Sequence, residues 1–345
     1  YCKLKIKFMA DLSVKYMGLS LKSPLIVGAS NLPTKPEVLK EIDKSGAGAV
    51  VYKSLFEEQI QLENLELSEI SDEMDNRDPE MSDMFPNIEH AGPKEYLYNL
   101  KMAKENLSIP LIASLNAVNK DTWVDYAKQI EETGVDGIEL NFFAVPSDID
   151  KETSDIILEQ VEILTAVKSV LKIPVAVKLS HFYANILNVV KQFNDAGADA
   201  VILFNRLFEP EIDVNTQKHI VPFDLSQPGD YRLSLRFSGL LYDKINASIC
   251  ASSGIYQGTD IAKMILAGAD TVQVVSAIYK YKTGHISQML NNLKQWMDDN
   301  NYKSLNDFRG KLSAKSVEDK RIYRRAQYID LLLKANDVFK KYPMI

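Results

Sequence analysis

One phrase recurs four times along this chain and restricts the folds that it can adopt. Residues 46–50, 134–138, 197–201 and 268–272 each read as a glycine, a short turn and then β-branched residues. Each copy follows a segment whose apolar residues recur with helical periodicity. Glycine commonly ends a helix in the left-handed conformation, and the β-branched residues that follow favour a buried strand. The phrase therefore predicts repeated helix-to-strand connections.

Proline marks the start of three further strands. Pro24, Pro110 and Pro174 each stand before a short apolar run. Proline is tolerated at the first position of a strand, where its missing N–H does not interrupt the ladder. Residues 247–251 form one more such run. Eight short strands are therefore expected, and they begin near residues 25, 49, 110, 137, 174, 200, 247 and 271.

Helical segments separate these strands, at residues 35–45, 93–106, 121–133, 153–170, 183–196 and 259–267. Strict alternation of strand and helix implies parallel strands joined by crossovers. Eight such units predict an α/β protein with a closed (β/α)8 TIM barrel, whose chemistry lies at the C-terminal ends of the strands. A doubly wound open sheet is the alternative. A closing helix is expected at 285–297, and a charged helical segment on the outside at 306–342.

Two connections are too long to be plain loops. The first insertion, residues 56–90 after strand two, is dense in Glu and Asp. The second, residues 206–232 after strand six, contains a potential hairpin. Long insertions at a barrel mouth commonly serve as lids or substrate loops. A solvated acidic loop or a subunit contact is an equally good interpretation of the first insertion.

Composition excludes several function classes. The formal net charge of −7 argues against nucleic-acid partners and against adhesion to anionic lipid. The only cysteines, Cys2 and Cys250, cannot form a disulfide framework or a cysteine-rich metal site, so no metal is expected and a reducing cytoplasm fits best. No apolar run approaches the roughly 20 residues that span a bilayer. A soluble, cytoplasmic protein is expected.

One domain is expected to cover residues 9–345. Residues 1–8 precede Met9, which begins a plausible protein start. They lack the apolar core of a signal peptide. We interpret them as an upstream extension or a cloning scar.

The predicted strands deliver polar residues to the barrel mouth. Burying Lys or Asn without a partner is unfavourable, so their repeated occurrence at buried strand ends predicts a large polar ligand. Loops after strands seven and eight are the common phosphate site of such barrels. The residues concerned, in strand order, are Ala29 and Ser30, Lys53 and Ser54, Asn116, Asn141, Lys178, Asn205, Ser253 and Gly254, and Ser276 and Ala277.

Lys178 and Lys53 suit a flavin. A lysine beside the pyrimidine edge of the ring stabilises the negative charge that reduction adds. Two other interpretations of such a lysine are a Schiff-base aldolase, in which the amine attacks a carbonyl, and an ion pair with a structural carboxylate. The amide side chains of Asn116, Asn141 and Asn205 favour the flavin, because they match the edges of a flat heterocycle.

An ordered set of motifs between about residues 12 and 282 resembles the dihydroorotate dehydrogenase family. Such ordered coverage is more specific than any single motif. The motifs are Ala-Ser at 29–30, Val-Tyr-Lys-Ser at 51–54, Ile-Glu-Leu-Asn at 138–141, Val-Ala-Val-Lys-Leu at 175–179, Phe-Asn at 204–205, Phe-Ser-Gly at 237–239, Ser-Ser-Gly-Ile at 252–255 and Ala-Gly-Ala-Asp-Thr-Val-Gln-Val at 267–274.

The resemblance implies an FMN-dependent oxidoreductase that acts on a CH–CH bond in pyrimidine biosynthesis. In the family's reaction, dihydroorotate loses a proton from C5 and a hydride from C6, which passes to flavin N5. The soluble members that this chain resembles are typically homodimers. The implied ring and ribityl contacts are Ala29, Ser30, Lys53, Ser54, Asn116, Asn141 and Lys178. The implied phosphate contacts are Gly239, Ser253, Gly254, Ser276 and Ala277. The implied substrate contacts are Lys53, Asn141 and Asn205.

The chain departs from the family pattern near the substrate. By this resemblance, Ala144 stands where the family has its Cys or Ser base, Pro146 replaces the family asparagine that follows, and Met81 stands at the position of a substrate-binding asparagine. Arg206 replaces a small hydroxyl residue; facing the site, it would bind a carboxylate through two donors. Ser147 is the candidate replacement base, although a turn serine is the simpler interpretation of it.

These departures leave several functions open. An FMN oxidoreductase acting on a different cyclic or unsaturated carbonyl compound is the second hypothesis. A Schiff-base aldolase on the same barrel is the third, and a flavin-binding protein without catalysis is the fourth. The true substrate, the catalytic base and the electron acceptor are not determined by the sequence.

Overall fold

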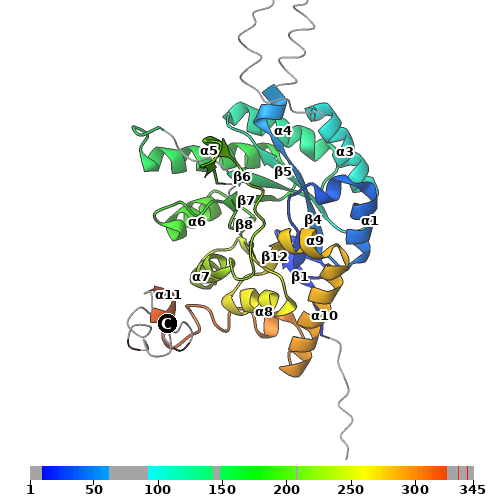
Figure 1. The fold of residues 1–345 in the computed structure, drawn as a ribbon, viewed down its shortest axis with the longest axis vertical. Coiled ribbons are helices and arrows are strands. Elements are labelled where there is room, and N and C mark those ends of the chain that lie inside the picture. Colours follow the sequence, from blue (N-terminus) through cyan, green and yellow to red (C-terminus); the bar gives the residue numbers. More distant parts are fainter. Residues whose placement is uncertain are drawn as a thin grey trace, which may run out of the picture.

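The protein folds into a closed barrel of parallel strands. The computed structural model describes residues 10–61, 92–142, 148–206 and 209–324, together with Leu333 and Lys340. The barrel order is β11-β12-β3-β4-β5-β6-β7-β8, and Figure 1 shows the helices surrounding it. This order confirms the predicted (β/α)8 barrel. The alternative prediction, a doubly wound open sheet, is wrong. The strands are β3 (Leu25–Val27), β4 (Ala49–Phe56), β5 (Leu111–Asn116), β6 (Gly137–Phe142), β7 (Val175–Leu179), β8 (Ala200–Leu203), β11 (Ser248–Ala251) and β12 (Thr271–Val274).

Helices connect the strands close to the predicted positions. The recurring glycines are confirmed as left-handed: Gly46, Gly134, Gly197 and Gly268 have φ of 95°, 83°, 90° and 131°. Each therefore reverses the chain between a helix and the next strand. The helices are α1 (Pro36–Lys44), α3 (Pro93–Glu105), α4 (Lys120–Glu132), α5 (Thr153–Val170), α6 (Ile186–Asp195), α7 (Arg232–Leu241), α8 (Gly258–Ala267), α9 (Ser276–Tyr281) and α10 (Gly284–Asp299), with short 3₁₀ turns at η1 (Leu32–Thr34) and η3 (Leu305–Asp307).

A hairpin that the sequence analysis missed packs against the interior of the barrel. Its strands are β1 (Val14–Tyr16) and β2 (Leu19–Leu21). Tyr16 and Met17 are buried, and the backbone N–H of Met17 donates to Ser248 Oγ at 3.1 Å. Because Ser248 begins β11, the hairpin lies at the N-terminal end of the barrel. The mouth at the opposite end is thus the open one. The apolar cluster around the hairpin contains Leu21, Ile26, Ala49, Val51, Ile112, Ala176, Ala200, Ile202 and Cys250.

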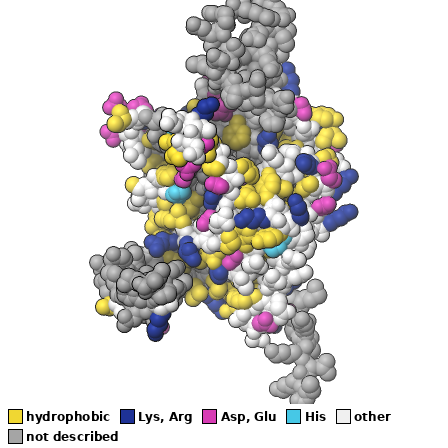
Figure 2. Space-filling model, in the orientation of Figure 1, with side chains coloured by type: hydrophobic (Ala, Val, Ile, Leu, Met, Phe, Trp, Pro, Cys, Tyr) yellow, Lys and Arg dark blue, Asp and Glu magenta, His cyan; other side chains and the backbone are white. Residues whose placement is uncertain are grey.

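The insertion after β8 contains the predicted hairpin. Its strands, β9 (Glu211–Asp213) and β10 (Lys218–Ile220), pair in antiparallel register. Of the first insertion, residues 62–90 lie outside the described residues. Within the described ranges, no helix has the length and apolar character needed to cross a membrane. Figure 2 shows basic and acidic side chains interspersed over the face in view.

The helix predicted at 306–342 is wrong over residues 308–320. After η3, residues 308–320 form turns and bends, and only α11 (Arg321–Arg324) is helical before the described range ends at residue 324. Gly310 has a left-handed φ of 71° and packs directly against the Tyr242 ring. A helix cannot continue through that conformation, so packing against Tyr242 outweighs the helical composition of the segment.

Candidate active site

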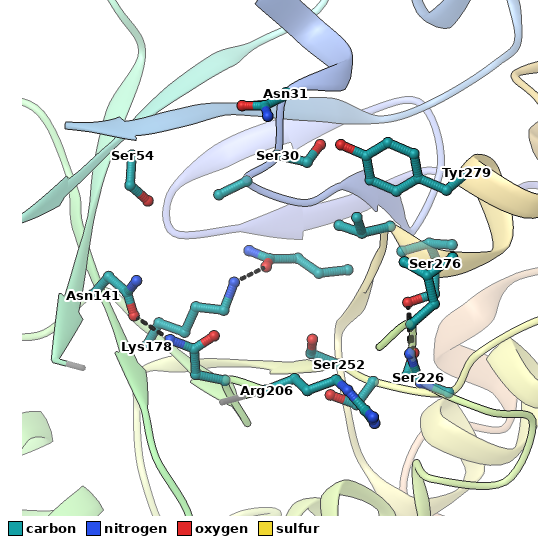
Figure 3. Close-up of a pocket in the computed structure, with 18 of the residues that line it drawn as sticks. Ser30, Asn31, Ser54, Asn141, Lys178, Arg206, Ser226, Ser252, Ser276 and Tyr279 are labelled. Atoms are coloured by element: carbon teal, nitrogen blue, oxygen red, sulfur yellow. Dashed lines mark hydrogen bonds between the residues drawn. The ribbon is translucent and has the colours of Figure 1, made fainter. Parts of the chain in front are cut away.

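A cavity of about 470 Å³ opens at the C-terminal ends of the strands, within the ~300–1,000 Å³ range of ligand sites. The barrel brings most of the predicted residues together there (Figure 3). Those that line the cavity are Ala29, Ser30, Lys53, Ser54, Asn141, Lys178, Asn205, Ser253, Gly254 and Ser276.

Lys53 is presented to the cavity by an irregularity in β4. The register with β5 shifts between Val51 and Ser54, so the strand carries an extra residue at this point. Bulges of this kind re-aim side chains beside functional sites. The buried Tyr96 hydroxyl lies 2.9 Å from the carbonyl oxygen of Lys53, which supports the bulged backbone. Ser54 Oγ and Ser114 Oγ, 2.7 Å apart, connect the two strands just beyond it.

Three asparagines form a connected row at the mouth. Asn205 Nδ2 donates to Asn141 Oδ1 at 2.6 Å, and Asn116 Nδ2 donates to the carbonyl of Asn141 at 2.7 Å. Asn141 and Asn205 line the cavity, whereas Asn116 lies behind Asn141. Asn116 therefore holds Asn141 in place, and Asn141 presents a fixed amide edge to the cavity.

Lys178 is a buried cation in the cavity wall. Its side chain comes from β7 and only 7% of the residue is exposed. Its Nζ lies 3.4 Å from Glu139 Oε1 and donates to Gln273 Oε1 at 3.1 Å. The dashed bond at Lys178 in Figure 3 is the one to the Gln273 amide. The lysine is thus paired with a structural carboxylate, as one interpretation of the sequence expected, and it also faces the cavity.

A cradle of hydroxyl and backbone groups occupies the end of the cavity formed by β11 and β12. Ser226 Oγ donates to Ser276 Oγ at 2.8 Å and accepts from the backbone N–H of Gly254 at 3.1 Å. Ser253 and Gly254 both have left-handed φ, of 70° and 66°. A side chain at Gly254 would meet the backbone of Gln227 and Asp230 at 2.6 Å. This close approach requires glycine.

These groups fit a flat, phosphorylated cofactor. The cradle places the Ser226 and Ser276 hydroxyl groups at the start of α9, and hydroxyl groups beside a helix start are a common phosphate site. The buried ammonium of Lys178 and the asparagine row lie in the same cavity. A cation and amides would face the polar edge of a heterocycle, while the phosphate would occupy the cradle.

Comparison with known proteins agrees with this site. The family model for dihydroorotate dehydrogenase matches residues 11–297. The chain belongs to the dihydroorotate dehydrogenase family. It is therefore an oxidoreductase of the kind that acts on CH–CH bonds, and enzymes of this family are generally flavin-dependent.

Three relatives illustrate the similarity. The catalytic subunit of dihydroorotate dehydrogenase B (NAD⁺) from Thermoplasma volcanium is 29% identical over 88% of this chain and 98% of its own length. The protein of the same name from Listeria welshimeri is 27% identical over 77% of this chain and 87% of its own length. A protein named putative dihydroorotate dehydrogenase A (fumarate), from Aeropyrum pernix, is 24% identical over 87% of this chain and 97% of its own length.

Some residues predicted from the family resemblance do not line the cavity. Gly239 lies in α7, directly against the Tyr323 ring, and its phosphate contact stays a prediction. Ala277 is fully buried in the first turn of α9, next to Ser276. Ser147, Ala144, Pro146 and Met81 lie outside the described residues.

Arg206, whose orientation the sequence left open, does face the cavity. Its Nη1 pairs with Asp230 Oδ2 at 2.9 Å, and its Nε donates to the carbonyl of Asp224 at 3.2 Å. Two of its donors are therefore already engaged by the protein. His181 lines a smaller cavity of about 200 Å³ on the other side of Arg206.

Sequence reasoning missed several residues of this family member's site. Glu139 and Gln273 were visible as polar residues inside apolar strands, a signal that would have found them. Ser226 had no such signal, because it lies in the insertion after β8. Phe223 and Tyr279 also line the cavity, and their rings meet edge to face with centroids 6.1 Å apart.

Proposed function

We propose that this protein is an FMN-dependent dehydrogenase that oxidises dihydroorotate to orotate in pyrimidine biosynthesis. The observation that supports it most is the single cavity in which the buried Lys178 cation, the row of Asn141 and Asn205, and the cradle around Ser276 meet. A cation, amides and a phosphate cradle in one cavity match one elongated ligand with a heterocycle at one end and a phosphate at the other.

The residues divide into those that would hold the cofactor and those that would hold the substrate. The cradle of Ser226, Gly254 and Ser276 would hold the phosphate, and Ala29, Ser30 and Ser54 would line the rest. When bound, FMN supplies a hydride acceptor at N5. Lys178 would stabilise the negative charge that reduction adds, since its ammonium is held in place by Glu139 and Gln273.

The residues that would hold the substrate are Lys53, Asn141 and Asn205. The asparagine pair would donate to and accept from the amide edge of dihydroorotate. Lys53, which the bulge in β4 turns toward the cavity, would bind its anionic group. Ser147 stays the candidate acceptor of the C5 proton.

An absorbance spectrum tests this assignment directly. The purified protein should show the flavin bands. Anaerobic addition of dihydroorotate should bleach them, with one dihydroorotate consumed for each flavin reduced. A flavin spectrum that dihydroorotate leaves oxidised would remove the substrate but keep the cofactor. A colourless protein that takes up no added FMN would overturn the proposal as a whole.

A different cyclic or unsaturated carbonyl substrate is the second candidate. It is favoured by Ala144 at the position of the family's base and by Arg206 in the cavity wall, held by Asp230. A charged guanidinium at this position would suit a substrate with another distribution of charge. Flavin reduction by a panel of saturated cyclic amides and acids, with dihydroorotate inactive, is the result that would select it.

The Schiff-base aldolase is disfavoured by the surroundings of Lys178. An amine must be uncharged to attack a carbonyl, whereas this lysine is held in an ion pair with a buried carboxylate. Borohydride trapping of a carbonyl substrate on Lys178 would reverse this judgement.

We further propose a homodimer in the cytoplasm. Relatives are named as catalytic subunits, so the test must also detect a second kind of subunit. Light scattering of the protein purified from its native source would distinguish a dimer of this chain from a monomer and from an assembly with another chain.

A further inference from the structure

In the function proposed so far, one interior carboxylate does no more than help to hold Lys178 in place. Glu139, on β6, is 1% exposed and pairs in register with Ala176 of β7, whose side chain belongs to the barrel-interior cluster. A carboxylate buried this deeply is strongly unfavourable unless it is paired. Its Oε1 accepts no hydrogen bond from the residues that the structure describes, although Lys178 Nζ lies 3.4 Å away.

Gln273 joins this carboxylate to Lys178 a second time. Its Nε2 donates to Glu139 Oε2 at 2.5 Å, and its Oε1 accepts from Lys178 Nζ at 3.1 Å. The amide is therefore oriented at both ends, because only its NH₂ group can donate to a carboxylate and only its oxygen can accept from an ammonium. Three strands, β6, β7 and β12, thus contribute one closed triangle inside the barrel.

Two residues of the triangle face the cavity and the third lies behind them. Lys178 and Gln273 line the cavity, whereas Glu139 does not. An ammonium has three N–H donors. Gln273 accepts from one of them, and Glu139 forms an ion pair with Nζ without accepting a hydrogen bond, so the ammonium retains N–H groups for a ligand. Glu139 therefore stands behind the lysine and compensates its charge without touching what the lysine binds.

Two titratable side chains lie in the barrel interior beneath the triangle. Tyr16 and Cys250 are buried in the barrel-interior cluster. Burial raises the pKa of the Cys250 thiol to about 12 and raises that of the Tyr16 hydroxyl well above its ordinary value. Both groups are neutral near pH 7, so they neither add to the charge of Glu139 nor cancel it.

We propose that Glu139 is a positioning residue that acts through Lys178 and Gln273 to reduce the positive charge felt by the flavin, and so holds the flavin's midpoint potential below the value an uncompensated lysine would impose. This rests on the proposed function for the presence of FMN. Reduction adds negative charge to the ring, so a lone cation would favour it. A carboxylate behind that cation opposes part of the effect.

The test measures the midpoint potential of the bound flavin by dye-equilibrated reductive titration of the holoenzyme. Glu139→Gln keeps the size of the side chain and removes its charge. It should raise the preference of the protein for reduced over oxidised flavin by about tenfold, equivalent to about 30 mV for a two-electron couple. Glu139→Asp keeps the charge and should stay near the wild-type potential.

Asp270→Asn is a matched control for loss of a buried carboxylate. Asp270 accepts from the backbone N–H of Ile249 at 2.8 Å and pairs with Arg309, and it does not line the cavity. This variant should lower the stability of the protein and leave the potential unchanged. The comparison separates an effect of charge on the flavin from general damage to the barrel.

Three results would overturn the inference. One is an unchanged potential in fully flavin-loaded Glu139→Gln, and another is an equal shift in Glu139→Asp. The third concerns folding: if Glu139→Gln and Glu139→Met both fail to retain flavin while Glu139→Asp retains it normally, the carboxylate serves the fold. A wild-type protein without flavin would instead contradict the proposed function itself, so the two failures are distinguishable.

Discussion

Asn205 Nδ2 donates to Asn141 Oδ1 at 2.6 Å across the mouth of the barrel. Asn141 lies near the end of β6 and Asn205 follows β8, and these strands are not neighbours in the sheet, because β7 lies between them. The bond therefore spans the mouth above Lys178. It joins the two amide side chains into one polar edge that faces the cavity, and the orientation of this edge depends on both residues.

Loss of this bond should weaken substrate binding more than cofactor binding. Asn205→Ala leaves Asn141 free to turn and removes one direct contact. We expect kcat/KM for dihydroorotate to fall by about 10–100-fold, as for loss of a hydrogen bond to a charged ligand, with flavin content unchanged. Steady-state kinetics and the flavin-to-protein ratio measure this. Asn106→Ala, which removes an exposed bond to Met102, is the control, and an equal loss in that variant would contradict the assignment.

Removal of Lys178 alone should destabilise the protein. Lys178→Met leaves Glu139 buried without its counter-ion, which typically costs about 3–5 kcal/mol. The double variant Lys178→Met with Glu139→Gln should recover part of that loss, because no charge is then left unpaired. Both variants should be inactive. Urea unfolding at a fixed FMN concentration measures the difference in stability. Equal stability of the two variants would show that the unpaired charge of Glu139 does not cause the loss of stability in Lys178→Met.

The close approach at Gly254 should make alanine unfavourable there. Gly254→Ala forces a side chain into a left-handed backbone and against Gln227 and Asp230. We expect a loss of about 2–4 kcal/mol of stability from strain and overpacking together, and weaker FMN binding by equilibrium dialysis. Gly134 also has a left-handed φ, 83° against 66° at Gly254, but a side chain there meets nothing within 4 Å, so Gly134→Ala is the control. It should lose only about 1–2 kcal/mol and retain full FMN affinity.

Cys250 should be unreactive in the folded protein and should make stability fall at alkaline pH. Burial raises its pKa from the ordinary 9.0 to about 12. Below pH 9 both the folded and the unfolded state keep the proton, and the full contribution to stability is present. Between pH 9 and about 12 only the unfolded state loses it, so stability falls as pH rises.

The matching measurement compares the wild type with Cys250→Ala in a Cys2→Ser background. The free energy of unfolding should decline more steeply with pH in the protein that retains Cys250, by at most about 1.4 kcal/mol per pH unit. Iodoacetamide at pH 8 should modify Cys250 only in urea. Rapid modification of the folded protein would contradict its burial.

Much of the architecture could be predicted because its signals are local. Each barrel strand begins within one residue of its expected start. Glycines such as Gly46 and Gly197 ended helices as expected, since a left-handed residue is a property of the chain over a few positions. The helix predicted at 306–342 is absent from residues 308–320 for a tertiary reason, the packing of Gly310 against Tyr242.

The residues of the candidate site also divide into those with a local sequence signal and those placed by tertiary packing. Lys178, Asn141 and Ser276 were identified from their positions at strand ends. Gly239 was assigned from the resemblance alone, and the structure places it against Tyr323. Ser226 joined the cradle only because the insertion after β8 folds back over the mouth. Nothing in the pattern of that insertion indicates where it returns.

The sequence by itself determined the alternation of strands and helices, the closure expected of eight such units, and the set of polar residues at the mouth. These follow from periodicity and from the conformational preferences of glycine and proline, which act over a few residues. Only the tertiary structure decided which side chains meet. Glu139 and Gln273 are 134 positions apart in the chain, and their contact exists because closure of the barrel brings β6 and β12 to face each other across its interior.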